Sequence, residues 1–598
     1  MTAVASIGEA LHAGRLMEAV DAARDALAAA PGDFEAAYLK ALALSRLGAA
    51  DAAAALLRQV LARDDVPDAL RAETLALDGR LAKDRLASLA PQAIPEQARE
   101  ACRRYEEAFE LVPNAFAAIN AASLHLLAGD GASSARLSRE AARLARRAPP
   151  LDHWAAATLG EAALLQGDIA EAREQYRRAH DLAGQRHGDV ASMRRQLRLL
   201  ALCLPDAQSL LQAVPAPTVV AFTGHMVDAP GRAAPRFPPE IELLVAAAID
   251  RWLDGAGPVV GYSQAACGSD ILFLEALQRR GLETNVVLPC ARADYVEQSV
   301  AFAGGSWMGR FERALVAATT VSNATAEAYL GDEVLFEHAS RLIDGQALLR
   351  ARQLEGGASM LAVLDTGSAA GAGGTYGTLR EWTDGGRHAD VIDIAALRGA
   401  PGAPSAEVAA APAVPRAARL GRVIVWIVFA DVRGFSTLPE QHSPRFAERF
   451  LGEARDALRA CGDQVHTTQT AGDGVYATFG SARAAASFAI DLRDRVQRVD
   501  WTQFGMSPDT TVRVAGHCGP AYRIMCPVTD RPNYCGTHII RTARVEPVVT
   551  PGEVFVTDSM AAYLALEAAD AFECDYLGVL PLAKGAGSSA LYRLRRKN

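Results

Sequence analysis

The sequence lacks any CxxC pair, any apolar run of membrane-spanning length and any excess of basic residues. Its nine cysteines are odd in number and scattered, which indicates neither a disulfide framework nor a zinc motif and predicts reduced thiols. The N-terminal stretch has no basic segment and contains Glu9, unlike a signal peptide. The most apolar stretch, 423–430, is far shorter than the ~20 residues that cross a bilayer. We therefore expect a soluble, cytoplasmic protein without a membrane partner.

The charge balance is acidic, with 70 Asp and Glu against 61 Lys and Arg and a net charge of -9. This balance argues against a general nucleic-acid-binding surface. Apolar residues make up 50% of the chain and charged residues 22%, as in ordinary globular proteins. A chain of 598 residues is too long for one hydrophobic core, so we expect roughly three to five domains.

Residues 1–210 are rich in Ala, Leu and Arg, with apolar residues at the i, i+3, i+4 spacing of helices. The segment "GRLMEAVDAARDALAAAPGDFEAAYLKALALSRLG" sets a pattern of paired helices with Gly and Pro at the turns, which two later segments repeat weakly. Such pairs stack because each buries its apolar face against its neighbour. The block resembles tetratricopeptide repeats, and the alternative is a plain helical bundle. Either fold predicts contact with an unknown protein partner or dimerisation.

Residues 215–397 alternate between apolar strands and helices. Strands are predicted within "TVVAFTG", "PVVGYS", "ETNVVLP", "SMLAVLDTG" and "HADVIDIAAL". This alternation predicts a Rossmann-like, doubly wound α/β domain with a parallel sheet. The following stretch, 398–418, is rich in Ala and Pro without periodicity and is typical of a semi-rigid linker.

Doubly wound folds bind ligands at the C-terminal ends of their strands. Here those ends carry Gly224, His225, residues 268–270 and the glycine-rich residues 371–378. The arrangement resembles nucleotide-sensing families related to lysine-decarboxylase-like and DNA-processing Rossmann-like proteins, which implies a small-molecule or nucleotide ligand. Because no complete GxGxxG follows the first strand, a purely structural role stays open.

The block 420–598 has the order strand, helix, two strands, helix, strand, helix, strand, which predicts a ferredoxin-like α+β fold. Its first strand ends on Asp431, and Asp473 lies between two glycines at the tip of a hairpin. Adjacent antiparallel strands can bring these carboxylates together, where they suit hard cations such as Mg²⁺. Each aspartate taken alone fits a turn-capping role, but the pair favours a metal site.

Four motifs of this block occur in the order found in class III nucleotidyl cyclases: "FADVRGFS", "TAGDGVYATF", "VRVAGHCGPAY" and "YCGTHIIRTARVEP". The block resembles that family, which converts a nucleoside triphosphate into its 3′,5′-cyclic monophosphate and pyrophosphate. The resemblance implies that Asp431, Asp473 and the backbone at Val432 hold two Mg²⁺ or Mn²⁺ ions. It also implies that Gly434 and Phe435 lie close to the phosphates of the substrate.

The family works as a head-to-tail dimer with sites at the subunit interface. The resemblance therefore implies a homodimer in which one chain supplies the metal aspartates and the other the base-reading and transition-state residues. Counted from Gly536, the transition-state arginine is Arg544, whose charged fork suits charge developing on the α-phosphate. The alternative for Arg544 is a solvated position on a helix face.

Three positions depart from the family pattern. Ile540 replaces the usual ribose-orienting asparagine, and Ala586 replaces a phosphate-binding lysine that Lys584 could substitute. Gln469 and Asn533 stand where adenylate cyclases usually have Lys with Asp or Thr, and guanylate cyclases Glu with Cys. Amides both donate and accept hydrogen bonds, so this pair fits adenine or, turned over, guanine.

We favour ATP over GTP, because some bacterial adenylate cyclases carry amide pairs; the alternative is that Gln469 reads no base. The sequence thus predicts an adenylate cyclase that makes cyclic AMP and is regulated by its two N-terminal blocks. Two other hypotheses stay open. One is a cyclase acting on GTP or another triphosphate, and the other is a non-catalytic signalling protein with a degenerate cyclase fold.

Overall fold

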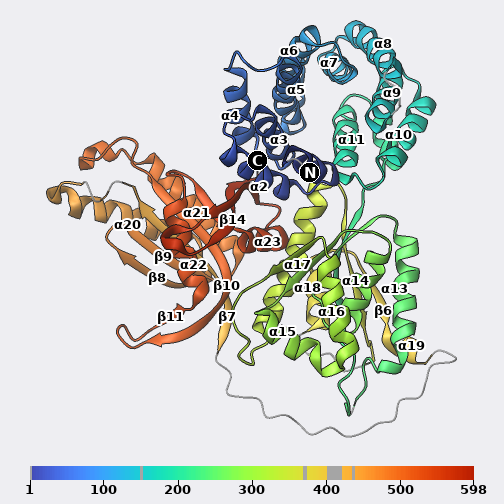
Figure 1. Ribbon diagram of the computed structural model, residues 1–598. Helices are drawn as coiled ribbons and strands as arrows, with labels where there is room; N and C mark the ends of the chain where they lie inside the picture. The colour runs from blue at the N-terminus through green and yellow to red at the C-terminus, as the bar shows by residue number, and fades with distance from the viewer. Residues whose placement is uncertain are drawn as a thin grey trace. The chain divides into compact units, whose positions relative to one another are not determined.

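The protein is seen in a computed structural model, which describes residues 3–147, 152–232, 234–367, 374–399, 421–433, 435 and 438–597. The chain forms two compact units (Figure 1). The first comprises Met1–Pro217 with Arg352–Gly356, and the second comprises Thr218–Ala351 with Gly357–Lys597. Within the described ranges, no helix combines the length and the apolar character of a membrane span.

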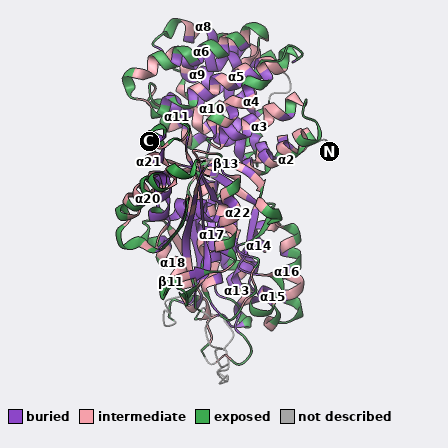
Figure 2. Ribbon diagram, turned by 90° about the vertical axis from the view of Figure 1, so that its left-hand side faces the viewer, coloured by how far each residue is buried: buried purple, intermediate pink, exposed green. Residues whose placement is uncertain are grey.

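The first unit is built from helices that pack pairwise along the chain, with their buried faces turned toward one another (Figure 2). Asp33, Asn114, Asp152 and Asp168 each accept a hydrogen bond from a backbone N–H three residues further on, which fixes where four of these helices begin. The helices are α1 (Ala3–Ala13), α2 (Leu16–Ala29), α3 (Phe34–Arg46), α4 (Ala50–Leu61), α5 (Asp68–Asp84), α6 (Ile94–Leu111), α7 (Ala115–Leu127), α8 (Gly131–Arg147), α9 (His153–Leu165), α10 (Ile169–Ala183), α11 (His187–Leu200) and α12 (Asp206–Leu210).

The second unit begins with a parallel sheet in the order β4-β3-β2-β1-β5-β6. Its strands are β1 (Thr218–Gly224), β2 (Val259–Ser263), β3 (Thr284–Leu288), β4 (Thr320–Asn323), β5 (Ala358–Leu364) and β6 (Ala389–Asp393). Its helices are α13 (Glu242–Ala256), α14 (Ser269–Arg279), α15 (Arg292–Ser299), α16 (Gly305–Ala317), α17 (Val334–Gln353), α18 (Thr375–Asp384) and α19 (Ile394–Arg398). We call these elements the α/β block. The predicted doubly wound fold is confirmed.

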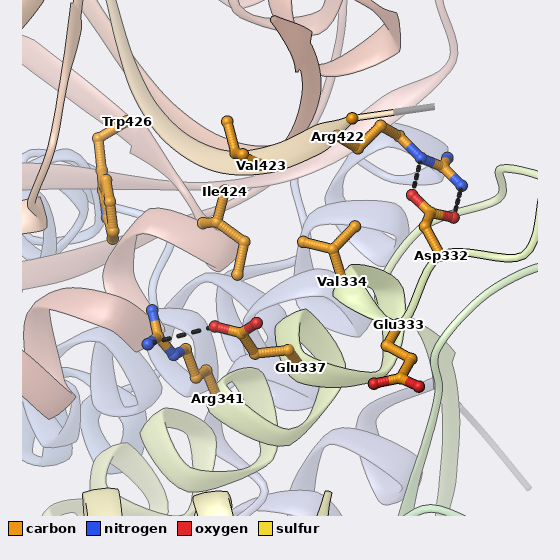
Figure 3. Close-up of a pocket in the computed structure, with 10 residues that line it drawn as sticks. Asp332, Glu333, Val334, Glu337, Arg341, Arg422, Val423, Ile424 and Trp426 are labelled. Carbon is orange, nitrogen blue, oxygen red and sulfur yellow. Dashed lines mark hydrogen bonds and ion pairs between the residues drawn. The ribbon is translucent and has the colours of Figure 1, made fainter. Parts of the chain in front are cut away.

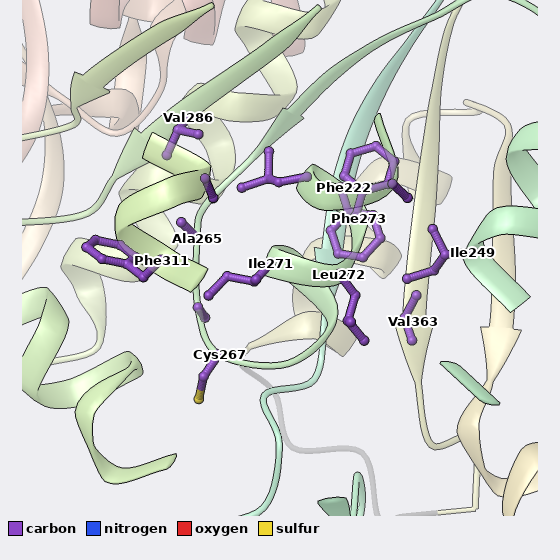
Figure 4. Packing of buried hydrophobic residues seen from close by; sticks show 14 of the residues in the cluster. Phe222, Ile249, Ala265, Cys267, Ile271, Leu272, Phe273, Val286, Phe311 and Val363 are labelled. Carbon is purple, nitrogen blue, oxygen red and sulfur yellow. The ribbon is translucent and has the colours of Figure 1, made fainter. Parts of the chain in front are cut away.

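The sequence predicts every strand of this sheet except β4. All four residues of β4 are exposed, so it has no apolar run to mark it. The core of the sheet is aromatic and aliphatic (Figure 4). The rings of Phe222 on β1 and Phe273 on α14 stack with their centroids 4.3 Å apart. Most of the predicted linker, from residue 400 onward, lies outside the described residues, and Arg398 is the last residue of α19.

The C-terminal block of the second unit contains a mixed sheet in the order β13-β14-β12-β10-β7-β9-β8, with β11 paired to β10. The strands are β7 (Arg422–Val432), β8 (Val465–Ala471), β9 (Gly474–Phe479), β10 (Val512–Cys526), β11 (Arg531–Cys535), β12 (Val554–Thr557), β13 (Phe572–Pro581) and β14 (Ser588–Arg596). The helices are α20 (Ser443–Ala460), α21 (Ala482–Arg498), α22 (Thr537–Val545) and α23 (Asp558–Glu567). Four strands of this sheet, in the order β10-β7-β9-β8, form its ferredoxin-like part. Numbered from 1 to 4 along the chain, they lie in the order 4-1-3-2, which confirms the predicted ferredoxin-like core.

Helix α17 of the α/β block packs directly against the C-terminal block. A methyl group added to Gly345 would collide with the carbonyl oxygen of Ala562 on α23, so only glycine fits there. The fully buried His338 lies 3.0 Å from the Tyr563 hydroxyl through its Nδ1 atom. Its ring also meets that of His538 on α22 edge to face, with centroids 5.8 Å apart.

A buried ion-pair network joins the same two blocks at the start of β7. The guanidinium of Arg422 donates to both carboxylate oxygens of Asp332 and, at 2.8 Å, to Glu327. The Arg422 side chain is 2% exposed. A charge that is buried so deeply needs all its partners, because a missing one leaves an uncompensated charge.

Replacing Asp332 should therefore destabilise the second unit. Asp332→Ala leaves the buried Arg422 guanidinium with Glu327 as its remaining carboxylate, and we expect a loss of about 3 kcal/mol in the free energy of unfolding. Differential scanning calorimetry of the full chain measures it as a lower transition temperature for this unit. The matched control is Asp456→Ala, which breaks an exposed ion pair with Arg455 and should leave the transition unchanged. Equal transitions for both variants would contradict a stabilising role for the network.

Candidate active site

Strand register brings two carboxylates together at one end of the C-terminal sheet. Asp431 on β7 lies opposite Gly474 on β9 and opposite Arg513 on β10. Asp473 directly precedes Gly474 in the turn between β8 and β9, where Gly472 adopts a positive φ of 62° that suits glycine. The two aspartate side chains are close enough to share a hydrogen bond when one is protonated. The predicted pairing of Asp431 with Asp473 is thus present in the structure.

The electrostatics of this pair are unfavourable in the absence of a cation. Burial, followed by the charge of Asp431, raises the pKa of Asp473 to about 6. Burial likewise raises the pKa of Glu546, just beyond α22, to about 7, and both aspartates add to the effect while Arg513 opposes it. One guanidinium therefore faces three carboxyl groups. Such a donor set of oxygens with excess negative charge fits divalent cations.

Arg513 is the counter-charge within the cluster. Its guanidinium donates a 2.8 Å hydrogen bond to Asp431 and lies 2.9 Å from a carboxylate oxygen of Glu546. The sequence reasoning missed both Arg513 and Glu546. The antiparallel pairing of β10 with β7 is the signal that could have found Arg513, because it sets this residue directly beside Asp431.

The residues around the end of β7 form a packed wall beside the carboxylates. Val432 is 2% exposed and pairs with Val512, so its contribution to any ligand comes from the backbone. The ring of Phe435 packs on Phe446 of α20, with centroids 5.1 Å apart, and lies against Gly472 of the hairpin turn. Gly434, also predicted to lie near the phosphates, falls outside the described residues.

Among the described residues, no hydrogen bond or ion pair joins Arg544 or Lys584 to Asp431 or Asp473. Arg544 is half-buried on α22, and Lys584 is exposed in the turn after β13 with a left-handed φ of 58°. In the part of the chain that the structure describes, neither side chain forms a hydrogen bond or ion pair. Ile540, one turn before Arg544 on α22, is 58% exposed. The structure thus brings Asp431 and Asp473 together but does not add Arg544 or Lys584 to them.

Gln469 lies on β8 and Asn533 on β11, and a contact between side chains of these two strands joins them. Gln469 is exposed on β8 opposite Tyr476, which in turn pairs with Phe429 two residues before Asp431. Side chains of directly paired residues share a face, so Gln469 and Asp431 lie on the same face of the sheet. Asn533 on β11 accepts a hydrogen bond from the Tyr534 N–H at 2.8 Å. The Tyr534 hydroxyl lies 3.3 Å from His466 of β8.

A pocket of about 430 Å³ lies at the opposite end of β7 from the carboxylates (Figure 3). It is lined by Arg422, Ile424 and Trp426 of β7 and by Glu337 and Arg341 of α17, among others. A second hollow of about 370 Å³ adjoins the carboxylate end of the strand, beside Arg433. The larger pocket is therefore separate from the carboxylate cluster.

The chain matches two protein families. Residues 15–125 match the family described as Tetratricopeptide Repeats-Sensor, and residues 422–596 match the Adenylate and Guanylate cyclase catalytic domain. Both sequence resemblances, to tetratricopeptide repeats and to class III cyclases, are thereby confirmed. No curated protein matches the chain.

Similar solved structures include three cyclase domains. The adenylyl cyclase CyaB from P. aeruginosa is 19% identical, with 30% of this chain and 96% of that one covered and a TM-score of 0.27. The guanylate cyclase domain of RhGC from Catenaria anguillulae, in complex with GTP, is 20% identical over 29% and 97% of the two chains, with a TM-score of 0.25. An adenylate cyclase from Trypanosoma brucei in its monomeric state is 22% identical over 29% and 87%, with a TM-score of 0.25.

The raised pKa of Asp473 predicts how stability depends on pH in EDTA. A carboxyl group whose pKa rises from about 4 to about 6 on folding holds its proton more tightly in the folded state. The free energy of unfolding should therefore fall as the pH rises through this window and stay low above it. Asp473→Asn removes the titrating group, so the variant should exceed the wild type in urea midpoint by more at pH 7.5 than at pH 5.

The control for this measurement is Asp463→Asn, which changes an exposed carboxylate just before β8. This variant should follow the wild type at both pH values. If the difference in stability between Asp473→Asn and the wild type does not change with pH, the raised pKa of Asp473 is contradicted.

Proposed function

We propose that this chain, whose residues 422–596 form a catalytic domain of the adenylate and guanylate cyclase family, is an adenylate cyclase that converts ATP into 3′,5′-cyclic AMP and pyrophosphate. The observation that carries the proposal is the close pairing of Asp431 with Asp473 across β7 and the β8–β9 turn. Both carboxylates belong to motifs of that family, and their unbalanced charge supports a role in binding cations.

Asp431 and Asp473, with a backbone oxygen at Val432, would hold two Mg²⁺ or Mn²⁺ ions. Such ions favour ionisation of the attacking 3′-hydroxyl and neutralise the triphosphate. Arg513 would then change partner: once the charge of Asp431 is compensated, its guanidinium fork is available to a phosphate oxygen nearby. The backbone between Val432 and Phe435 would lie along the phosphates.

Arg544 would act in a second copy of the chain. Its guanidinium has no ion-pair partner among the described residues, the aspartates of its own chain included. A head-to-tail homodimer through the cyclase domain would set Arg544 of one copy against the α-phosphate held by the other, where it stabilises the developing charge. Ile540, one turn before Arg544 on α22 and 58% exposed, supports a covered surface at this place. Lys584 would contact the phosphates.

Gln469 and Asn533 would read the base. Both side chains are amides, and Asn533 already uses its carbonyl oxygen on the Tyr534 N–H, which leaves its NH₂ group to donate. A donor from Asn533 and an adaptable amide from Gln469 match the N1 acceptor and N6 donor of adenine. Neither residue brings a charge, so we expect discrimination between ATP and GTP to be weak.

The activity is tested by incubating the purified full chain with Mn²⁺ and each of four nucleoside triphosphates, followed by chromatography of the products. We expect cyclic AMP from ATP and less cyclic GMP from GTP. Asp473→Asn should reduce the rate at least 100-fold, because it removes a metal ligand. A folded protein that yields no cyclic nucleotide from any substrate would favour the non-catalytic alternative, which the apolar Ile540 also supports.

The shared site is tested by mixing inactive variants. Asp431→Ala and Arg544→Ala should each be inactive alone, because each lacks one half of every site. Random mixing makes half of the dimers mixed, and each mixed dimer has one intact site, so we expect roughly a quarter of the wild-type rate. Mixing Asp431→Ala with Asp473→Ala is the matched control and should restore nothing. An unchanged rate in both mixtures would contradict the shared-site dimer.

We also propose that the α/β block binds an anionic ligand, such as a nucleotide phosphate, and so regulates the cyclase domain. The strand order reverses between β1 and β5, which is where doubly wound folds bind ligands. His225 at the end of β1 is 5% exposed, yet its Nε2 atom has no hydrogen-bond partner in the described structure, and neither has the Nε atom of Arg236. The pKa of His225 is lowered to about 4 by burial and then by Arg236. These buried nitrogen atoms support an acceptor-rich ligand.

A thermal-shift screen of the full chain with ATP, ADP, cyclic AMP and inorganic phosphate tests this ligand. We expect one of these anions to raise the transition temperature in the wild type and not in Arg236→Gln. Arg251→Gln, on the exposed side of α13, is the matched control and should keep the shift. If no anion raises the transition temperature, or if the rise is the same in Arg236→Gln, the proposed ligand site is contradicted and the α/β block has a purely structural role.

A further inference from the structure

Three side chains with different metal-binding atoms meet between helices α6 and α7 of the first unit. Cys102 and Glu106 lie one turn apart on α6, and His125 lies on α7. The sulfur, carboxylate and imidazole atoms that could bind a metal all lie within 4.8 Å of one another. None of these residues belongs to the cyclase domain or to the ligand site proposed for the α/β block.

The packing of the helix pair sets this geometry. Cys102 is 3% exposed among Tyr105, Ala121 and other residues of the core between the helices. Its sulfur lies 3.6 Å from the carbonyl oxygen of Ala121 on α7, which shows how closely the two helices approach. Residues four apart on a helix share a face, so Glu106 stands above Cys102 at the rim of the same contact.

His125 is held with its Nε2 atom toward the cluster. That atom lies 2.8 Å from a carboxylate oxygen of Glu106, and the Nδ1 atom lies 3.5 Å from Asp130. Asp130 is itself fixed, because it accepts a hydrogen bond from the Ser133 N–H at 3.0 Å. Histidines that bind metals in proteins commonly present their second ring nitrogen to a carboxylate in this way, which orients the ring.

We propose that Cys102, Glu106 and His125 form a zinc site that clamps α6 to α7. One sulfur, one nitrogen and one carboxylate oxygen suit Zn²⁺, whereas Mg²⁺ and Ca²⁺ prefer oxygen alone. On binding, the Cys102 S–H bond breaks, a sulfur–zinc bond forms and the proton passes to solvent. Glu106 and His125 are partly exposed, with side-chain exposures of 40% and 19%, so water can fill the fourth position.

The site would be an exchangeable one, because three protein ligands leave zinc open on one side. Asp130 acts through His125 and is a positioning residue rather than a ligand. Zinc joined to both helices would stabilise this part of the first unit, because a metal that binds the folded state alone raises the free energy of unfolding. The inference does not depend on the proposed cyclase activity.

The test uses the full chain, freed of any affinity tag, stripped with EDTA and then dialysed against Zn²⁺ or Co²⁺. We expect one more tightly bound zinc per chain in the wild type than in Cys102→Ser or His125→Asn, measured by mass spectrometry of the metal content. With Co²⁺, the wild type should show a thiolate-to-cobalt absorption band, which Cys102→Ser loses. The band separates this site from the cyclase carboxylates, which contain no sulfur. Asp130→Asn should keep the stoichiometry and weaken zinc binding about 10- to 100-fold.

The controls are a cysteine and a histidine of the same unit in similar surroundings. Cys203→Ser changes an exposed cysteine, and His180→Asn changes a histidine of 21% side-chain exposure on α10. Both should bind zinc and cobalt as the wild type does. A wild type that binds no extra zinc, or a cobalt band that persists in folded Cys102→Ser, would show that the cluster is a hydrogen-bonded contact only and overturn the proposal.

Discussion

The pairing of β7 with two antiparallel neighbours is the constraint on which the candidate active site depends. It sets Asp431 beside Gly474 on one side and Arg513 on the other, so hydrogen-bonded ladders rather than a loop hold the carboxylate next to the turn that carries Asp473. The half-buried carboxylates of Asp431 and Asp473 repel each other. Glu546 adds a third carboxyl group, and the single guanidinium of Arg513 does not balance all three. The backbone hydrogen bonds of the sheet hold these carboxylates together against their repulsion. Groups with perturbed pKa values are common at functional sites.

Patterns that are local to the chain predict most of the fold and the central part of the site. Strand–helix alternation predicts both sheets, and Asp431 and Asp473 are recognisable because each stands at a visible boundary, a strand end or a turn between glycines. Arg513 has no such local signal: it lies within a strand and meets Asp431 across 82 residues of sequence. The exposed strand β4 is hidden for a different reason: Val321 is its single apolar residue, so no apolar run marks it. Pairing between distant segments is what a single sequence does not reveal.

The relation between the α/β block and the cyclase domain differs from what the Ala- and Pro-rich stretch between them suggests. The predicted semi-rigid linker would act as a spacer between domains, whereas helix α17 packs so closely on α23 that Gly345 has no room for a side chain. His338 continues this contact to His538 at the start of α22, the helix that carries Arg544. Nothing in the sequence of α17 marks these residues, because a glycine and a histidine within a helix have many structural explanations.

The anchoring of Arg422 has a mechanical consequence. This residue is the first of β7, and Asp431 is the last but one of the same strand. An extended strand is already near its maximum length per residue, so it behaves as a rod rather than a spring. A displacement of Asp332 and Glu327 that draws Arg422 along the strand axis would shift Asp431 by a similar distance, instead of being absorbed on the way. Strand β7 is thus a rigid connection between the two blocks. At the usual rise of a strand, the distance from Arg422 to Asp431 along it is about 30 Å.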